Sequence, residues 1–255
     1  DEYDEAKAIG IETRPVVIGA YSMLKLCRYT GKRTADDYAD AIARAYRELI
    51  ERCEEKQIAW VQFDEPALVQ DMEQSDIALF RGIYDTVLSG KKHCHVLLQT
   101  YFGDVRDIYT ELVQMPFDGI GLDFIEGKET ADLIERYGFP QDKRLFAGLV
   151  NGKNIWKNHY GKTLATLAAL KKRNVNTVLS TSCSLLHVPY TVQQENKLSQ
   201  DYLSHFAFAQ EKLTELGELS RLADLENYAQ DAAYADNRSL FAGKRDCENA
   251  AVKQR

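Results

Sequence analysis

The sequence predicts an α/β protein of the (β/α)8 TIM-type barrel class, with about six of the eight β/α units present in this chain. Short apolar runs alternate with longer amphipathic stretches from one end of the chain to the other. Most of these runs are continuous, which is typical of parallel strands that are buried on both faces. Polar side chains follow nearly every run, and the carboxyl ends of the strands carry the active site in barrels of this class.

The six apolar runs have strand length and are bounded by polar or turn-forming residues. They predict strands at residues 15–19, 58–63, 93–100, 120–124, 145–150 and 177–181. No glycine-rich GxGxxG or GxxxxGK[ST] motif follows any of them, which favours a barrel over an open doubly wound sheet. Six strands do not close a barrel of eight, so two strands are either hidden in the sequence or lie outside this chain.

The stretches between the strands have helical periodicity. They predict helices at 22–29, 36–56, 75–88, 104–114, 129–137, 160–172 and 199–216. Gly138 is expected to end the fifth of these, because glycine readily adopts the left-handed conformation that follows a helix. In the last one, Tyr202, Phe206, Ala209 and Leu213 are expected on one stripe.

Composition excludes several classes of protein. The 255 residues include 32 Lys and Arg against 39 Asp and Glu, and no basic block that would indicate a nucleic-acid partner. No apolar run has the length of a membrane span. The scattered cysteines form no CxxC pair, so we expect neither a disulfide framework nor a zinc ribbon, and we expect a reducing, cytoplasmic location. They are Cys27, Cys53, Cys94, Cys183 and Cys247.

Asp64 and Glu65 are the first candidates for chemistry, because they follow the second predicted strand directly. Adjacent residues of a strand point to opposite sides, so only one of the two carboxylates faces the barrel mouth. That carboxylate would serve as a general base or would bind a substrate ammonium group. The alternative is a loop carboxylate that caps the helix after Pro66.

Three further segments contain reactive side chains. His93 and His95 have the spacing of a pair of metal ligands, but no third ligand is near in sequence. They also stand at the start of a predicted strand, where the residues of a barrel contribute to stability. Cys183 and His187 are four residues apart and would form a nucleophile pair or two ligands, or simply pack. The loop at 151–156 would hold a ligand or form a tight turn and a helix start.

Five segments then match a known family in order: WVQFDEPALV (60–69), LLQTYFG (97–103), GLDFIEG (121–127), LFAGLVNGKNIW (145–156) and TSCSLLHVPY (181–190). Together they resemble the N-terminal domain of cobalamin-independent methionine synthase, a 5-methyltetrahydropteroyltriglutamate–homocysteine methyltransferase. The resemblance runs from about Pro15 to Leu216 and covers most of the chain.

The resemblance implies a polypeptide of two (β/α)8 barrels. The C-terminal barrel would bind zinc and homocysteine and perform methyl transfer. The N-terminal barrel would pack against it and help to hold the methyltetrahydrofolate polyglutamate. Residues 1–218 would then form a partial N-terminal barrel, from its third to its eighth strand. Residues 219–255 would form a helical tail or linker toward the second barrel, which this chain does not contain.

The family's zinc ligands offer an internal comparison between the two barrels. The catalytic barrel uses His-x-Cys, Glu and Cys, and the corresponding positions here are Gln99-x-Tyr101, Asp123 and Cys183. Only Cys183 is a good zinc ligand, because an amide and a phenol do not replace imidazole and thiolate. We therefore expect no metal in this barrel and zinc in the other barrel of the full-length enzyme.

The resemblance implies no catalytic residue in this chain, and Asp64, Glu65 and His187 remain candidates at the barrel mouth. An anionic polyglutamate tail needs cations, so Lys153 and Lys157 are possible helpers; the alternative is ordinary solvated surface lysines.

The main hypothesis from the sequence is a non-catalytic scaffold and folate-positioning barrel of a zinc-dependent methionine synthase. One rival is a stand-alone barrel enzyme that uses Asp64 or Glu65 in acid–base chemistry together with the loop of Cys183 and His187. A second rival is a purely structural barrel module. Two unpaired sheet edges weigh against the stand-alone enzyme.

Overall fold

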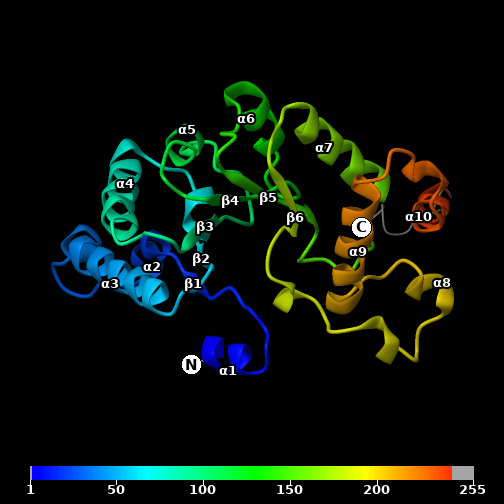
Figure 1. The fold of residues 1–255 in the computed structure, drawn as a ribbon, viewed down its shortest axis with the longest axis horizontal. Helices are drawn as coiled ribbons and strands as arrows, with labels where there is room; N and C mark the ends of the chain where they lie inside the picture. Colours follow the sequence, from blue (N-terminus) through cyan, green and yellow to red (C-terminus); the bar gives the residue numbers. More distant parts are fainter. Residues whose placement is uncertain (1, 243–255) are drawn as a thin grey trace, which may run out of the picture. The chain divides into compact units, whose positions relative to one another are not determined.

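The computed structural model describes residues 2–242. Its six parallel strands form one sheet in the order β1-β2-β3-β4-β5-β6 (Figure 1). Within the described residues this sheet stays open, with β1 and β6 at its edges. The predicted α/β fold with six β/α units is confirmed. The strands are β1 (Val16–Ile18), β2 (Trp60–Asp64), β3 (His95–Gln99), β4 (Gly119–Asp123), β5 (Arg144–Val150) and β6 (Thr177–Thr181).

The described part of the chain forms two compact units. The first contains the residues up to Leu149 together with Arg173–Cys183, and the second contains Val150–Lys172 and the residues from Ser184 onward. The division into a barrel at 1–218 and a tail at 219–255 stays a prediction. The end of that tail, 243–255, which includes Cys247, lies outside the described residues. Within residues 2–242, no helix is both long enough and apolar enough to cross a membrane.

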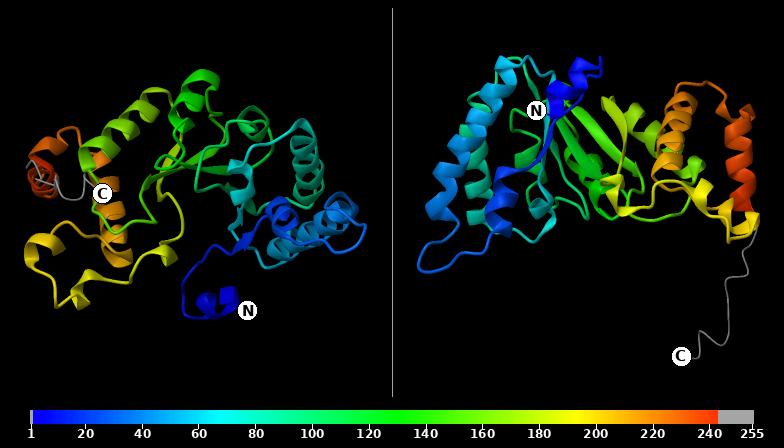
Figure 2. Two further views of the ribbon diagram at one scale, coloured as in Figure 1. Left: turned by 180° about the vertical axis from the view of Figure 1, so that it is seen from behind. Right: turned by 90° about the horizontal axis from the view of Figure 1, so that it is seen from below.

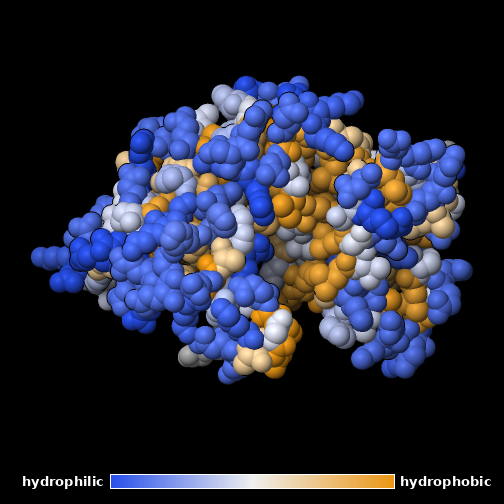
Figure 3. Space-filling model, viewed as in Figure 1, coloured by the Kyte–Doolittle hydropathy of each residue, from blue (hydrophilic) through white to orange (hydrophobic). Residues whose placement is uncertain are grey.

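The first unit covers its strands with helices. Phe63 of β2 contacts Tyr46 of α3 and Tyr84 of α4, with ring centroids 5.7 and 6.2 Å apart. Figures 1 and 2 show α3 and α4 side by side, and Figure 3 shows that their outer surface is hydrophilic. The helices are α1 (Glu2–Ala8), α2 (Ala20–Leu26), α3 (Asp36–Glu55), η1 (Pro66–Val69), α4 (Gln74–Leu88), α5 (Tyr109–Leu112) and α6 (Thr130–Tyr137). As predicted, α6 ends at Gly138, which has a φ of 76°.

Parallel register brings the carboxyl ends of the strands together. Asp64 pairs with Ile18 on one side and with Gln99 on the other, and Asp123 pairs with Gly148. Every residue of β4 is buried, because continuous apolar strands of this kind lie at the centre of a parallel sheet. Polar side chains that follow these strands are therefore held at one edge of a rigid sheet.

The helix predicted at 104–114 is much shorter than expected, since α5 covers only Tyr109–Leu112. The side chain of Asp104 accepts hydrogen bonds from Arg106 (2.7 Å) and from the Glu129 N–H (3.3 Å). The Ile108 N–H donates to the Val105 carbonyl, three residues back, as in a turn. Local side-chain bonds thus replace the first helical turns.

The second unit contains α7 (Tyr160–Lys172), η2 (Leu185–His187), η3 (Val192–Gln194), α8 (Gln200–Leu203), α9 (Ala209–Ala223), η4 (Tyr228–Gln230) and α10 (Ala232–Ala242). The single helix predicted at 199–216 is wrong, because it is split into α8 and α9. Between them the Ala207 N–H donates to the Ile155 carbonyl (2.8 Å), and the His205 carbonyl accepts from the Lys157 N–H (2.9 Å). This extended pairing uses the backbone groups that a continuous helix would need.

The stripe predicted for that helix is wrong as well. Tyr202 and Leu213 are exposed, whereas the buried face of α9 is formed by other residues. These are Lys212, Glu215, Leu219 and Leu222.

Candidate functional site

The carboxyl ends of β2, β3, β4 and β6 bring most of the predicted site residues into the first unit. Asp64 ends β2, Gln99 ends β3, and Asp123 ends β4. Tyr101 contacts Asp64 through a hydrogen bond and interacts electrostatically with Cys183. This edge of the sheet is the candidate site.

Asp64 is the half-buried carboxylate of this edge. Its oxygens accept hydrogen bonds from Gln62 Nε2 (2.7 Å) and from the Tyr101 hydroxyl (3.0 Å). Burial raises the pKa of Asp64, while these two hydrogen bonds and the charge of Arg14 act in the opposite direction. The same burial, together with the Asp64 charge, raises the pKa of Tyr101. The pair can accept or pass on a proton, which is the chemistry of a general base.

Glu65 does not share this environment, because it points to the opposite side of the sheet. It is fully buried, and its carboxylate accepts hydrogen bonds from the Tyr21 N–H (3.0 Å), the Ser22 N–H (2.7 Å) and the Tyr84 hydroxyl. The carboxylate therefore holds the first turn of α2 against α4, and not the helix after Pro66. Burial raises its pKa to about 7. The alternation of strand residues accounts for the different surroundings of these two adjacent acids.

The residues that the resemblance aligns with zinc ligands do not fit a metal. Gln99 donates from Nε2 to the Thr100 carbonyl (2.9 Å), and its amide lies where a Cβ on Gly121 would be. Asp123 Oδ1 accepts from the N–H groups of Ile125 (2.7 Å) and Glu126 (3.0 Å). These groups are engaged by the chain itself, and an amide is a poor zinc ligand. Among the described residues, no group of three or more His, Cys, Asp or Glu side chains is arranged to hold a metal ion.

Asp123 also stabilises an uncommon backbone conformation. Its Oδ2 accepts from the Phe102 N–H (3.0 Å), and Phe102 has a φ of 73°. A positive φ is uncommon for a residue with a side chain and requires support from its surroundings. Asp123 thus joins the loop after β3 to the loop after β4, which is a structural role.

Cys183 and His187 fall in different units. Cys183 is buried at the end of the first unit, and His187 is exposed at the end of η2 in the second unit.

The His93–His95 segment lies at the amino end of β3, away from the candidate site. His95 Nδ1 is 3.2 Å from Asp118 Oδ1, and its ring lies on Trp60 with centroids 4.8 Å apart. The His93 N–H donates to the Glu54 carboxylate at 2.8 Å. The His95 side chain therefore packs on Trp60 and faces Asp118, whereas the His93 side chain is exposed.

The loop after β5 forms a turn. Asn151 Oδ1 accepts from the N–H groups of Lys153 (2.8 Å) and Asn154 (3.0 Å), and Asn154 Oδ1 accepts from Trp156 (3.1 Å). Lys153 is exposed, whereas Lys157 is half-buried and lines a pocket of the second unit.

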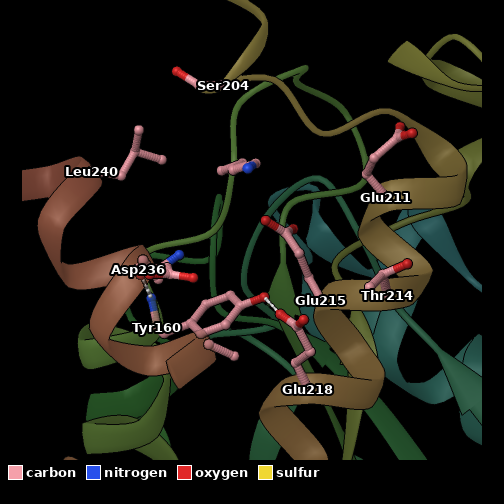
Figure 4. Close-up of a pocket in the computed structure, with 11 residues that line it drawn as sticks. Tyr160, Ser204, Glu211, Thr214, Glu215, Glu218, Asp236 and Leu240 are labelled. Carbon is pink, nitrogen blue, oxygen red and sulfur yellow. Dashed lines mark hydrogen bonds between the residues drawn. The ribbon is translucent and has the colours of Figure 1, made fainter. Parts of the chain in front are cut away.

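That pocket was not found by sequence reasoning. It has a volume of about 380 Å³ and lies between α7, α9 and α10 (Figure 4). Its walls carry Lys157, Tyr160, Asn237 and four acidic residues, which are Glu211, Glu215, Glu218 and Asp236. One sequence signal was present: Glu215 has helical spacing with Leu219 and Leu222, which indicates a charged residue on a buried helix face.

Residues 1–175 match the family described as "Cobalamin-independent synthase, N-terminal domain". This match covers more than half of the chain, and the chain belongs to that family. The resemblance found in the sequence is confirmed.

Relatives of the chain include proteins named 5-methyltetrahydropteroyltriglutamate--homocysteine methyltransferase. Those from Streptococcus suis and Lactococcus lactis subsp. lactis are 50% and 47% identical over 255 residues. One from Campylobacter jejuni subsp. jejuni is 46% identical over 254 residues. Each comparison covers 100% of this chain and 33% of the relative, so the chain spans about a third of their length.

Two solved structures support the fold. A B12-independent methionine synthase from Shewanella sp. W3-18-1 has a TM-score of 0.60 at 18% identity, over 88% of this chain and 66% of that one. A putative vitamin-B12 independent methionine synthase from Listeria monocytogenes has a TM-score of 0.61 at 15% identity, over 83% and 63%.

Proposed function

We propose that this chain is the non-catalytic, supporting part of a zinc-dependent methionine synthase. The whole enzyme would transfer a methyl group from 5-methyltetrahydropteroyltriglutamate to homocysteine. Family membership and the names of the relatives support this reaction. The supporting role rests on one observation at the ends of β3 and β4. The side chains of Gln99 and Asp123 are hydrogen-bonded to backbone groups of the chain itself.

In this proposal a second barrel would hold zinc, which would lower the pKa of the homocysteine thiol. The thiolate would form a bond to the methyl carbon while the bond from that carbon to the folate nitrogen breaks, and the nitrogen would take up a proton. The present chain would contribute a rigid wall, because the oxygens of Asp123 and Glu65 tie loops and helices to the sheet. A fixed wall matters, since methyl transfer needs donor and acceptor held in line.

Folate positioning is the second part of the proposal. Of the two candidate lysines, Lys153 is better placed to bind the anionic polyglutamate tail, because its side chain is exposed. Lys157 lies among the carboxylates of the second-unit pocket, which disfavours an anionic polyglutamate beside it. In this proposal the partners of the chain would be the second barrel, homocysteine and the folate polyglutamate. The enzyme would act in the cytoplasm, which is the location that the cysteine pattern predicts.

Methionine formation tests this proposal. The chain, the remainder of the polypeptide, and both together would each be mixed with homocysteine, methyltetrahydropteroyltriglutamate and zinc. We expect methionine only when the remainder is present, with zinc bound to the remainder. Methionine formed by the chain alone would refute the supporting role.

A second candidate function rests on Asp64, whose raised pKa and contact with Tyr101 suit acid–base chemistry. A stand-alone enzyme of this kind would lose activity in Asp64→Asn. For the supporting role, the same variant of the intact enzyme should retain methyl transfer, because Asp64 would not touch the reacting atoms.

A further inference from the structure

The second-unit pocket contains a buried carboxylate oxygen that nothing in the described chain satisfies. Glu215 is only 4% exposed, and its Oε1 accepts a hydrogen bond from the Asn158 N–H at 2.8 Å. Its Oε2 has no hydrogen-bond partner among residues 2–242. Buried polar atoms are nearly always paired, because an unpaired one loses its bonds to water without compensation. Oε2 therefore indicates a missing donor.

The neighbouring carboxylates differ in how far they are already engaged. Glu215 and Glu218 extend from α9 into the pocket, and Glu218 accepts a hydrogen bond from the Tyr160 hydroxyl (Figure 4). Glu211 is used at the start of α9, where it accepts from Thr191 Oγ1 (2.7 Å) and from the Phe208 N–H (3.1 Å). Asp236 stands on α10 at the exposed rim. Glu215 and Asp236 thus offer acceptors on two walls.

Two lysines lie near Glu215, and both favour its charged form. Lys212 is fully buried, and its Nζ donates to the Trp156 carbonyl at 3.1 Å. Lys157 is the only basic residue among those that line the pocket in the described chain. The four lining carboxylates therefore outnumber the two nearby lysines, Lys157 and Lys212, and the local potential favours a cation.

We propose that this pocket binds a short aliphatic diamine, with one ammonium group on Glu215 Oε2 and the other toward Asp236. Leu240 and Ala233 offer an apolar wall to the methylene chain between them. The volume of about 380 Å³ accommodates such a molecule. A metal ion fits less well, because no described group of acidic, His or Cys side chains has the arrangement of a metal site. The pocket and its ligand are independent of the methyl-transfer reaction.

The ionisation of Glu215 agrees with this ligand. Burial raises its pKa to about 6, so the group is charged at neutral pH and becomes neutral in mild acid. Affinity for a diamine should therefore fall as the pH drops below about 6. The charged or titratable groups around Glu215 are Lys157 from the loop before α7, Tyr160 from α7, Glu211, Lys212 and Glu218 from α9, and Asp236 from α10.

Equilibrium dialysis of the full-length protein with radiolabelled putrescine tests the proposal at pH 7.5 and pH 5. We expect saturable binding of one putrescine at pH 7.5. Glu215→Gln keeps the size of the side chain and its bond to Asn158, and should weaken binding about tenfold or more, because a charge-assisted hydrogen bond is lost. The control Glu226→Gln removes the same charge at an exposed position in the same unit and should bind as the wild type does.

Two further probes make the result decisive. Butylamine has one ammonium group and should bind more weakly than putrescine by about tenfold. Asp236→Asn changes an exposed rim residue, so it preserves the fold even if Glu215→Gln does not, and it should remove the advantage of putrescine over butylamine. The proposal is overturned if putrescine does not bind, if Mg²⁺ displaces it at equal concentration, or if well-folded Glu215→Gln and Asp236→Asn both bind like the wild type.

Discussion

Replacing Glu65 with glutamine should change how the stability of the protein depends on pH. Glutamine has nearly the same shape, but its single Oε1 replaces only one of the two oxygens that accept the Tyr21 and Ser22 N–H groups. The cost of that lost acceptor does not depend on pH. Glutamine cannot ionise, however, and Glu65 is fully buried beside Tyr84 and the first turn of α2. The change with pH in the stability difference between wild type and variant therefore isolates the free-energy cost of a buried negative charge.

The magnitude follows from the pKa of Glu65, which burial raises from an ordinary 4.5 to about 7. The folded protein holds the Glu65 proton more tightly than the unfolded chain does. Protonated Glu65 therefore makes its full contribution to the unfolding free energy below pH 4.5, and this contribution is lost as the pH rises to about 7. Each pKa unit corresponds to about 1.4 kcal/mol, so the wild type should lose about 3 kcal/mol of unfolding free energy through this group. The hydrogen bonds from Tyr21 and Ser22 lower the pKa and are already included in that value.

Urea unfolding of wild type and Glu65→Gln at pH 4.5, 6 and 7.5 measures this effect. The difference in unfolding free energy between the two proteins should shift by about 3 kcal/mol in favour of the variant between the first and last pH. All other titrating groups cancel in that difference. The matched control is Glu55→Gln, which removes an exposed carboxyl at the end of α3. The difference in unfolding free energy between this variant and the wild type should stay constant over the same pH range.

A difference between wild type and Glu65→Gln that stays within about 0.5 kcal/mol over this pH range would refute the reasoning. It would mean that Glu65 ionises as it does in the unfolded chain. Burial and its hydrogen bonds would then offset each other.

Three other changes have definite expected outcomes. Gly19→Ala places a Cβ 2.1 Å from Glu65 Oε1, and this clash should lower the unfolding free energy by about 2 kcal/mol or more. Gly82→Ala places its Cβ where no atom lies within 4 Å, and it should raise the unfolding free energy by about 0.5–1 kcal/mol. Thermal and urea unfolding of the two variants measure both changes. Asp123→Asn removes the acceptor of the Phe102 N–H and should cost about 1–3 kcal/mol in the same assay, and an unchanged midpoint would contradict its structural role. Cys183→Ser should leave methyl transfer by the intact enzyme within about threefold, while a loss of about 100-fold would assign Cys183 to the reaction.

Strand periodicity and the polar residues after the strands were sufficient to predict the parallel sheet and the edge that carries the candidate site. Continuous apolar runs predict burial on both faces, and this holds for β3, β4 and β5, whereas the edge strands β1 and β6 are partly exposed. The placement of Asp64 and Asp123 at the strand ends follows directly. The resemblance in five segments is confirmed by the family to which the chain belongs.

The prediction for residues 199–216 was wrong because helical spacing does not reveal a competing partner for the backbone. The segment around Ala207 pairs with residues about 50 positions earlier, near Ile155. No window of the sequence contains both halves of that pairing. Tertiary context therefore overrode a genuine helical pattern.

The sequence by itself determined the alternation of strands and helices and the family. Only the tertiary structure decided which carboxylates are engaged. It gave Asp64 and Glu65 different surroundings, and it buried Glu215 with one oxygen that has no hydrogen-bond partner among residues 2–242. The physical reason is that burial and hydrogen-bond partners come from distant segments, and these surroundings, not the residue type, set the charge state of a carboxyl group.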